Sequence, residues 1–549
     1  MLKVIDNPFY YLDNFHQALD WIGARYDDLL TQEEHGFIGH FLALPQTSRA
    51  LFVRMVMRKG ALFRASKLSY AEIGDTHQAA LPLLDAGWIA HDPLLTLEQL
   101  FELLQKQEIG RIFRLSAHEK NARKAAQLAA LRAHYPAACH FSAWYEHSGD
   151  HLYEVQSKAL CERLRLIFFG NFRQDWSEFV LSDLGVYKYE KVEFSPSSRG
   201  FRSRRDIDNY VALHQCRERF REQEPVAQVL RDLPQADADN DWLSSRRHKL
   251  LFQIAQHLEK SQDWAAAFQA YADCAYPGAR ARAIRVLEKS GQTGAAFERL
   301  CHAQRQPESE AERQQLLRIA PRLRRKLGHP RVAAAPIAPV RRVDVSLPMP
   351  TAPCYVEDVV KHHLARDDAP VYYVENTLIN SLFGLLCWDA IFKAIPGAFF
   401  HPFHRGPADL HTADFSQRRA REFAACLGQL DSEAYRCTIG HHYEAKFGIQ
   451  SPFVAWDFVD RHLIELALDC IPAAHLKKWF ERILLDIKTN RSGFPDLIQF
   501  WPAQRRYNMI EVKGPGDRLQ DNQKRWIDYC AQHDMPITVC YLQWSEARV

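Results

Sequence analysis

The chain has 549 residues, of which 47% are hydrophobic and 25% charged. This balance is typical of globular proteins and excludes a disordered chain, and the length predicts roughly three or four domains. The 70 Lys and Arg residues nearly balance the 67 Asp and Glu residues, which leaves a formal net charge of +3. Any surface that binds nucleic acid must therefore be local rather than a property of the whole chain.

The twelve cysteines include no Cys-x-x-Cys pair, which argues against a zinc finger of the usual spacing. We expect free thiols in a reducing compartment. The N-terminus has no basic region followed by an apolar run, and no apolar stretch approaches the ~20 residues of a membrane helix. The sequence therefore predicts a cytoplasmic protein without membrane contact.

The N-terminal part is predicted to be helical. In residues 1–65, Phe15, Leu19 and Ile22 recur at helical spacing. In residues 66–210, Thr96 and Gln99 predict a capping box at the start of an amphipathic helix. The short helices and glycine turn of this region resemble the small SAP-like folds that bind DNA phosphates, although a plain helical hairpin fits the pattern equally well.

Four arginines follow within seven residues that contain no carboxylate: Arg199, Arg202, Arg204 and Arg205. Arginines neutralise phosphates and release counterions, so this cluster predicts a DNA-binding surface. The alternative is a solvated loop.

An internal repeat occupies residues 240–330. Leu258-Glu259-Lys260-Ser261 recurs 29 residues later, beginning at Leu287. Helix pairs of this length predict a short tetratricopeptide-like stack, which can act as a spacer or bind other proteins. Prolines at 336, 339, 348, 350 and 353 then predict an extended linker over residues 331–353.

The last domain, residues 354–549 with a core at about 430–549, is predicted to be α/β. Strands are expected at 495–501 and 507–513, a helix at 519–530 and a strand at 537–544. Side chains two apart on a strand share a face, so Glu511 and Lys513 point the same way, with Asp496 across a hairpin. Such an oxygen-rich site suits Mg²⁺, and the carbonyl of Val512 can add a ligand.

The segments RSGFPDLIQFW (491–501) and NMIEVKGPGDRLQDNQKRWIDYC (508–530) closely resemble the virus-type replication-repair nuclease module of the PD-(D/E)xK superfamily. The resemblance implies that Asp496, Glu511 and Lys513 are catalytic and that Gln523 supports them. It also places Asp517 and Arg518 beside the site, with Arg518 available to DNA.

Two further segments, ENTLINSLFGLLCWDAIF (375–392) and WSEFVLSDLGVYKY (176–189), resemble the Fanconi-associated nuclease family. The resemblance implies a multidomain protein with mostly α-helical N-terminal and middle regions before the nuclease domain. It implies Mg²⁺- or Mn²⁺-dependent cleavage of 5′-flap and branched double-stranded DNA, 5′-to-3′ exonuclease action and a role in interstrand crosslink repair. Since no cysteine precedes Cys139, we expect a bacterial-type, nucleoid-associated member without the family's ubiquitin-binding zinc finger.

The resemblance also implies that Glu375 is a metal ligand together with Asp496, Glu511 and Val512. Two alternatives remain for this position. Glu375 could simply favour the start of a helix through the helix dipole, and Asp389 could supply the acidic group instead. For the whole chain, the alternative function is a non-catalytic DNA-binding scaffold whose repeats recruit repair proteins.

Overall fold

The computed structural model describes residues 7–113, 115, 119, 121–146, 148–194, 198–235, 240–331, 339–412 and 414–545. These residues form two compact units. The first comprises Met1–Tyr187 and Arg199–Ile207, and the second comprises Lys188–Ser198 and Asp208–Val549. Among the described residues, no helix combines the length and apolar character that a membrane span requires.

The first unit is mainly helical, as the sequence predicts. Its helices are α1 (Tyr10–Tyr26), α2 (Gln32–Ala43), α3 (Gln46–Val56), α4 (Thr76–Asp85), α5 (Leu97–Leu103), α6 (Lys106–Ile112), α8 (Lys124–Leu131), α9 (Phe141–Trp144), α10 (Lys158–Phe169) and α11 (Ser177–Asp183), and its strands are β1 (Leu62–Arg64), β2 (Ile89–His91), β3 (Leu94–Leu95), β4 (Cys139–His140) and β5 (Leu152–Val155). The predicted capping box is present, because Thr96 Oγ1 accepts from the Gln99 backbone at 3.3 Å and Gln99 Oε1 accepts from the Thr96 backbone at 2.9 Å.

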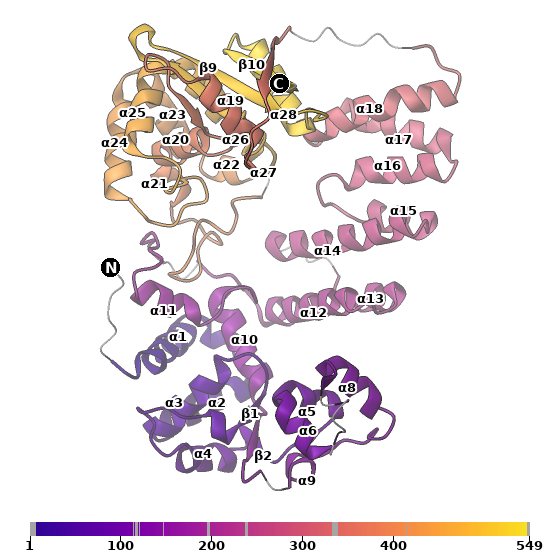
Figure 1. Ribbon diagram of the computed structural model, residues 1–549, viewed down its shortest axis with the longest axis vertical. Coiled ribbons are helices and arrows are strands. Elements are labelled where there is room, and N and C mark those ends of the chain that lie inside the picture. Colours follow the sequence, from indigo (N-terminus) through magenta and orange to yellow (C-terminus); the bar gives the residue numbers. More distant parts are fainter. Residues whose placement is uncertain are drawn as a thin grey trace. The chain divides into compact units, whose positions relative to one another are not determined.

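The predicted repeat is a run of consecutive antiparallel helices (Figure 1). After α12 (Arg204–Arg221) and α13 (Val226–Asp232) come α14 (Asp241–Lys260), α15 (Trp264–Ala272), α16 (Ala279–Lys289), α17 (Thr293–Arg305) and α18 (Glu310–Lys326). The 29-residue offset places Glu259 and Glu288 at equivalent positions of α14 and α16. Both carboxylates are buried and bind an arginine of a later helix, Arg282 at 2.9 Å and Arg322 at 2.9 Å respectively.

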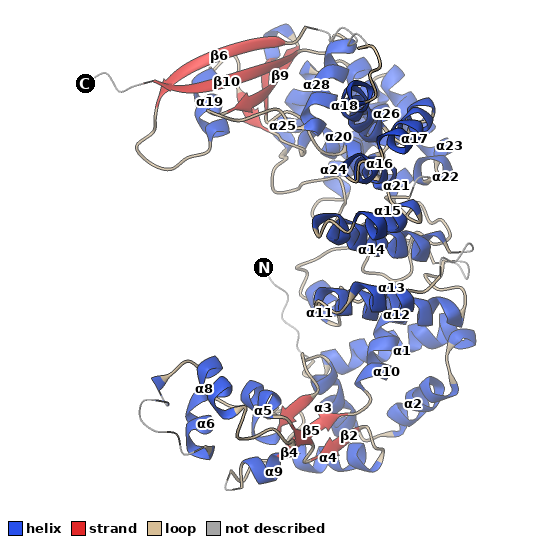
Figure 2. Ribbon diagram, turned by 90° about the vertical axis from the view of Figure 1, so that its right-hand side faces the viewer, coloured by secondary structure: helices blue, strands red, loops and turns tan. Residues whose placement is uncertain are grey.

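The C-terminal domain is a mixed five-stranded sheet with helices on both faces. Its strands are β6 (Arg341–Pro348), β7 (Val371–Tyr373), β8 (Leu497–Trp501), β9 (Arg506–Lys513) and β10 (Ile537–Ser545), and its helices are α19 (Val356–Leu364), α20 (Leu378–Leu386), α21 (Trp388–Ile391), α22 (Phe415–Arg418), α23 (Ala420–Gly428), α24 (Ala434–Ala445), α25 (Arg461–Cys470), α26 (Ala473–Leu485), α27 (Ile487–Asn490) and α28 (Asp521–Gln532). The strand order is β6-β10-β9-β8-β7. Strand β8 runs antiparallel to both neighbours, and β10 runs parallel to β9 and β6, which lie side by side with it in Figure 2.

The two faces of this sheet bury different cores. Ile498, Phe500 and Met509 pack into the large core formed with α20, α26 and α28. Val512 and Ile510 point to the other face, where α19 covers them with Val360. This alternation along β9 places Glu511 and Lys513 on the opposite side from Val512, as the two-residue period of a strand predicts.

The predicted linker at 331–353 is partly wrong, because residues 341–348 form strand β6. Pro336 lies outside the described residues. Proline cannot donate a ladder hydrogen bond, but Pro348 occupies the last position of an edge strand, where proline is tolerated. The alternation of Val343, Val345 and Leu347 with exposed residues was the available sign of a strand.

Candidate active site

The ends of three strands bring the predicted acidic residues to one edge of the sheet. Strands β8 and β9 pair Leu497 with Ile510, so one step further the register sets Asp496 opposite Glu511. The carbonyl oxygen of Asp496 accepts from the Val374 backbone at 2.8 Å, just beyond β7. Its carboxylate Oδ2 accepts from the Val512 backbone N–H at 2.8 Å. Asp496 is therefore fixed between β7 and β9 through both its backbone and its side chain.

Glu511 is fully buried, at 0% exposure, next to Lys513. The Lys513 Nζ lies 2.8 Å from Glu511 Oε1. Neither carboxylate oxygen of Glu511 has a well-directed hydrogen bond within the described part of the chain. A buried ionised carboxylate normally has its oxygens satisfied by hydrogen bonds or by a cation, so this geometry leaves Glu511 short of partners.

Burial raises the pKa values of both acids, and the charges of nearby carboxylates add to each shift. Burial, and next the charge of Asp496, raise the pKa of Glu511 to about 8, although Lys513 opposes the shift. Burial raises the pKa of Asp496 to about 6, against the opposing effects of the Val512 N–H and Lys513. Both carboxylates can be ionised together at neutral pH only when positive charge in addition to that of Lys513 compensates them.

Glu375 lies in the turn after β7, whereas the sequence placed it at the start of a helix. Helix α20 begins three positions later, at Leu378. Tyr373 donates its hydroxyl to Glu375 Oε2 at 2.6 Å, and Asn376 donates Nδ2 to Oε1 at 3.1 Å. The charge of Glu375 contributes to the raised pKa values of Asp496 and Glu511, so it faces the same site.

The competing acidic residue, Asp389, has no such link to the site. Its side chain is 81% exposed and lies 3.6 Å from His442. The geometry therefore favours Glu375 over Asp389.

Glu357, in the first turn of α19, is an acidic neighbour that sequence reasoning missed. Its charge also contributes to the raised pKa of Asp496. An isolated acidic residue at a helix start is common on any surface helix, so the sequence alone gave no reason to select it.

Asn376 and Gly493 fix the turn that carries Asp496, the first by hydrogen bonds and the second by close approach to α28. Asn376 Oδ1 accepts from the backbone N–H groups of Gly493 and Phe494, at 2.8 and 3.1 Å. Gly493 has φ +95°, and a Cβ there would lie 2.7 Å from the backbone carbon of Asn522 in α28. Only glycine fits this close approach. Asn376 thereby links Glu375 directly to the segment that ends in Asp496.

The oxygen atoms at this site are of the kind that bind divalent cations. Of the predicted acidic ligands, only Asp496 and Glu511 lie opposite each other at the ends of adjacent strands. Carboxylate and carbonyl oxygens are the ligands that Mg²⁺ and Mn²⁺ prefer, and the unsatisfied oxygens of Glu511 fit such an ion. Within the described ranges, no three or more His, Cys, Asp or Glu side chains are grouped closely enough to bind one metal. Glu375 and its hydrogen bonds to Tyr373 and Asn376 would have to rearrange for it to join Asp496 and Glu511.

Gln523 and Arg518, which the sequence places near the site, have no contact with its acidic residues among the contacts of the described chain. Gln523 accepts from the Gln520 backbone N–H at 2.8 Å and so completes a capping box at the start of α28. Arg518 is exposed. Its neighbour Asp517 accepts from the Gly514 backbone at 3.0 Å, which shapes the turn after β9.

The predicted arginine cluster lies in the first unit and is partly engaged in ion pairs. Arg199 lies 2.9 Å from Asp28, and Arg204 lies 2.6 Å from the fully buried Glu34. Arg202 and Arg205 are exposed. The seven residues of the cluster contain no carboxylate, but Asp28 and Glu34 from other segments of the unit pair with its arginines.

Comparisons with known families cover much of the chain. The models described as "FAN1, HTH domain", "Fanconi anemia-associated nuclease SAP domain" and "VRR-NUC domain" match residues 9–90, 94–144 and 431–544. The Fanconi-associated nuclease 1 homolog of Pseudomonas aeruginosa is 55% identical over 98% of this chain and 97% of its own length. The homolog of Oryza sativa is 25% identical over 96% of this chain and 62% of its own length.

Two solved structures of a Fanconi-associated nuclease are similar to this chain over nearly its whole length. The crystal structure of paFAN1 bound to 2nt 5′ flap DNA with gap has a TM-score of 0.96 and 55% identity, covering 99% of this chain and 100% of that one. A second crystal structure of paFAN1, bound to 1nt 5′ flap DNA with gap, has a TM-score of 0.93 and covers 98% of this chain and 100% of that one.

Proposed function

The chain belongs to the Fanconi-associated nuclease family, as its sequence resemblance predicted, and from that premise we propose that it is a metal-dependent nuclease that cleaves 5′-flap and branched DNA. The 55% identical relative is bound to 5′ flap DNA in two structures. The observation that carries the proposal is the buried, under-partnered Glu511 beside Asp496 and Lys513. The activity includes 5′-to-3′ digestion and serves interstrand crosslink repair.

Asp496, Glu511 and the Val512 carbonyl would hold Mg²⁺ or Mn²⁺, with Glu375 as a further ligand. A bound ion of this kind polarises a phosphoryl oxygen and lowers the pKa of a coordinated water. The resident residues do the rest. The Val512 N–H holds the Asp496 carboxylate in place, and Asn376 links Glu375 to the segment that ends in Asp496.

Lys513 supplies positive charge at the reacting centre. Its ammonium group lies at the end of β9, 2.8 Å from Glu511. From there it can orient an attacking water and offset the negative charge that develops on the phosphate. Gln523 supports this arrangement indirectly, by capping the helix that packs against the Asp496 turn.

DNA binding is assigned to the first unit and its arginines. Phosphate contacts from Arg202 and Arg205 fix position without reading sequence. Arg199 and Arg204 form ion pairs with Asp28 and Glu34, and they help to hold the cluster in the shape that contacts DNA. Arg518 contacts DNA near the nuclease site. The helical repeats offer a surface for other repair proteins.

The decisive assay is cleavage of a labelled 5′-flap duplex in Mg²⁺ and in Mn²⁺. Lys513→Met should slow cleavage by about 100- to 1000-fold, the effect of removing one charge-stabilising donor, while Asp496→Asn should abolish it. Flap affinity should stay nearly unchanged in both. Asp389→Asn is the matched control, because this exposed carboxylate lies outside the proposed site, and it should retain full activity. An intact flap with the wild-type chain in both metals would leave the non-catalytic scaffold as the better account.

A further inference from the structure

A cavity of about 450 Å³ opens on the face of the sheet that α19 covers only in part. Helix α19 ends at Leu364, at the rim of the cavity, and the apolar floor continues beyond it over Ile510 and Cys540. The floor then becomes polar at Asn508 and Thr538, whose side chains hydrogen-bond to each other at 3.1 Å. A cavity of this size is within the range of small-ligand sites.

The cavity lies on the other face of β9 from the nuclease site. Asn508 and Ile510 point into it, whereas Glu511 points to the opposite face. Asn508 also lies three residues before Glu511, or about 10 Å along a strand. A molecule bound here would not occupy the position of the bond being cleaved, so the cavity is a separate site.

The rim of the cavity is positively charged. Of the twelve residues that line it, two are arginines and none is Asp or Glu. Within the described ranges, neither Arg341 nor Arg506 forms an ion pair, whereas the neighbouring Arg342 points away and pairs with Asp344 at 2.7 Å. Two exposed guanidinium groups without carboxylates favour an anionic ligand with phosphate-like geometry.

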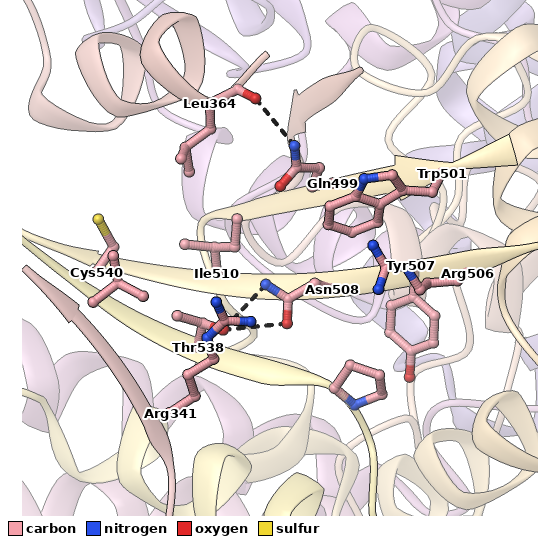
Figure 3. Close-up of a pocket in the computed structure, with 12 residues that line it drawn as sticks. Arg341, Leu364, Gln499, Trp501, Arg506, Tyr507, Asn508, Ile510, Thr538 and Cys540 are labelled. Carbon is pink, nitrogen blue, oxygen red and sulfur yellow. Dashed lines mark hydrogen bonds between the residues drawn. The ribbon is translucent and has the colours of Figure 1, made fainter. Parts of the chain in front are cut away.

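An aromatic plane and two amide side chains, those of Gln499 and Asn508, complete the lining. The guanidinium of Arg506 lies 4.1 Å from the ring centre of Trp501, which is half-buried at the rim. Figure 3 shows the Asn508 amide between Arg341 and Arg506, and the Gln499 oxygen turned toward Ile510 while its nitrogen donates to the Leu364 carbonyl at 3.0 Å. Ring faces stack on bases, and amides hydrogen-bond to base edges.

We propose that this cavity binds single-stranded DNA, with a base against Trp501 and Arg506 and a neighbouring phosphate at Arg341. Phosphate charge, a planar ring and amide-bonding edges occur together in a nucleotide, which matches the three features of the lining. A volume of about 450 Å³ suits a single nucleotide of a strand rather than a duplex. The identification of the strand as DNA rests on the proposed nuclease function, whose substrate has a single-stranded flap.

Binding is tested with the full chain and a fluorescein-labelled hexathymidylate with phosphorothioate linkages, in EDTA so that the strand stays intact. Fluorescence anisotropy should show affinity about 5- to 100-fold weaker for Trp501→Leu, the loss expected for one stacked base. Trp501→Phe, which keeps an aromatic ring, should recover most of the affinity. Arg341→Gln should reduce the slope of log K against log salt by about 0.7, the effect of one lost phosphate contact on a single strand. Arg342→Gln, on the same strand but facing away, should change neither.

Photo-crosslinking with a 5-iododeoxyuridine hexamer locates the bound strand. The crosslinked peptide should contain Trp501 or Tyr507. The proposal would be overturned if crosslinks formed only in other peptides, or if Trp501→Leu bound the strand with an affinity within twofold of wild type. It would also be overturned if polyglutamate displaced the labelled strand and the Trp501 variants had no effect on binding. Flap cleavage by the same preparations distinguishes this proposal from the proposed nuclease function. A crosslink at Trp501 with an uncut flap would reject only the nuclease function. A cut flap without that crosslink would reject only DNA binding in the cavity.

Discussion

Metal binding by the acidic pair should depend steeply on pH, because a cation must displace protons from two carboxylates whose pKa values are raised. With pKa values of about 8 for Glu511 and about 6 for Asp496, roughly 1% of Glu511 and half of Asp496 are ionised at pH 6. At pH 8, half of Glu511 and nearly all of Asp496 are ionised. The apparent affinity for Mn²⁺ should therefore rise about 100-fold between pH 6 and pH 8.

Isothermal titration calorimetry with Mn²⁺ at pH 6, 7 and 8 measures this rise directly. Repeating the titrations in buffers of different ionisation enthalpy gives the number of protons released, which should fall from about 1.5 at pH 6 to about 0.5 at pH 8. Glu511→Gln is the matched control, because it keeps the shape of the side chain and removes the proton that the metal displaces. It should bind Mn²⁺ weakly and with little pH dependence.

Mn²⁺ affinity that is constant from pH 6 to pH 8, with no protons released, would refute this reasoning. So would a Glu511→Gln chain with the affinity and pH slope of the wild type, because the measured binding would then belong to another site.

Three further outcomes follow from the geometry. Gly493→Ala should destabilise the C-terminal domain by at least about 1 kcal/mol, since a left-handed backbone and a backbone contact both oppose a side chain; hydrogen exchange of the β9 amides measures this. Arg204→Ala should destabilise the first unit, by about 1–3 kcal/mol in urea unfolding, because the buried Glu34 loses a partner, whereas Arg205→Ala should leave stability unchanged and lower the salt slope of DNA binding by about 1. Without metal, the wild-type chain should lose stability relative to Glu511→Gln as the pH rises from about 4.5 to about 8, because the raised pKa of Glu511 makes its ionised form unfavourable in the folded state. Thermal melts across this range measure the difference, which should vanish at low pH.

The sequence predicted the hairpin of the site to within two residues. Alternation and turn residues are local signals, so strands at 495–501 and 507–513 were visible without a structure, and they correspond to β8 and β9. The Thr96–Gln99 capping box was visible for the same reason.

Contacts between distant segments could not be predicted in this way. Glu34, a carboxylate that pairs with Arg204, lies 170 positions earlier in the chain, so the sequence around the cluster shows no carboxylate. Strand β6 is recognisable as part of the sheet only through its pairing with β10, almost 200 residues later. Asn376 illustrates the same limit, because its hydrogen bonds to Gly493 and Phe494 depend on the folded turn.

The central claim is that Asp496 and Glu511 share one divalent cation at the edge of the sheet. Anomalous diffraction from crystals of the full chain grown with Mn²⁺ at pH 8 tests it most directly. The account predicts an anomalous peak in contact with both carboxylates. A peak bound elsewhere, with Asp496 and Glu511 both free of it, would contradict the claim.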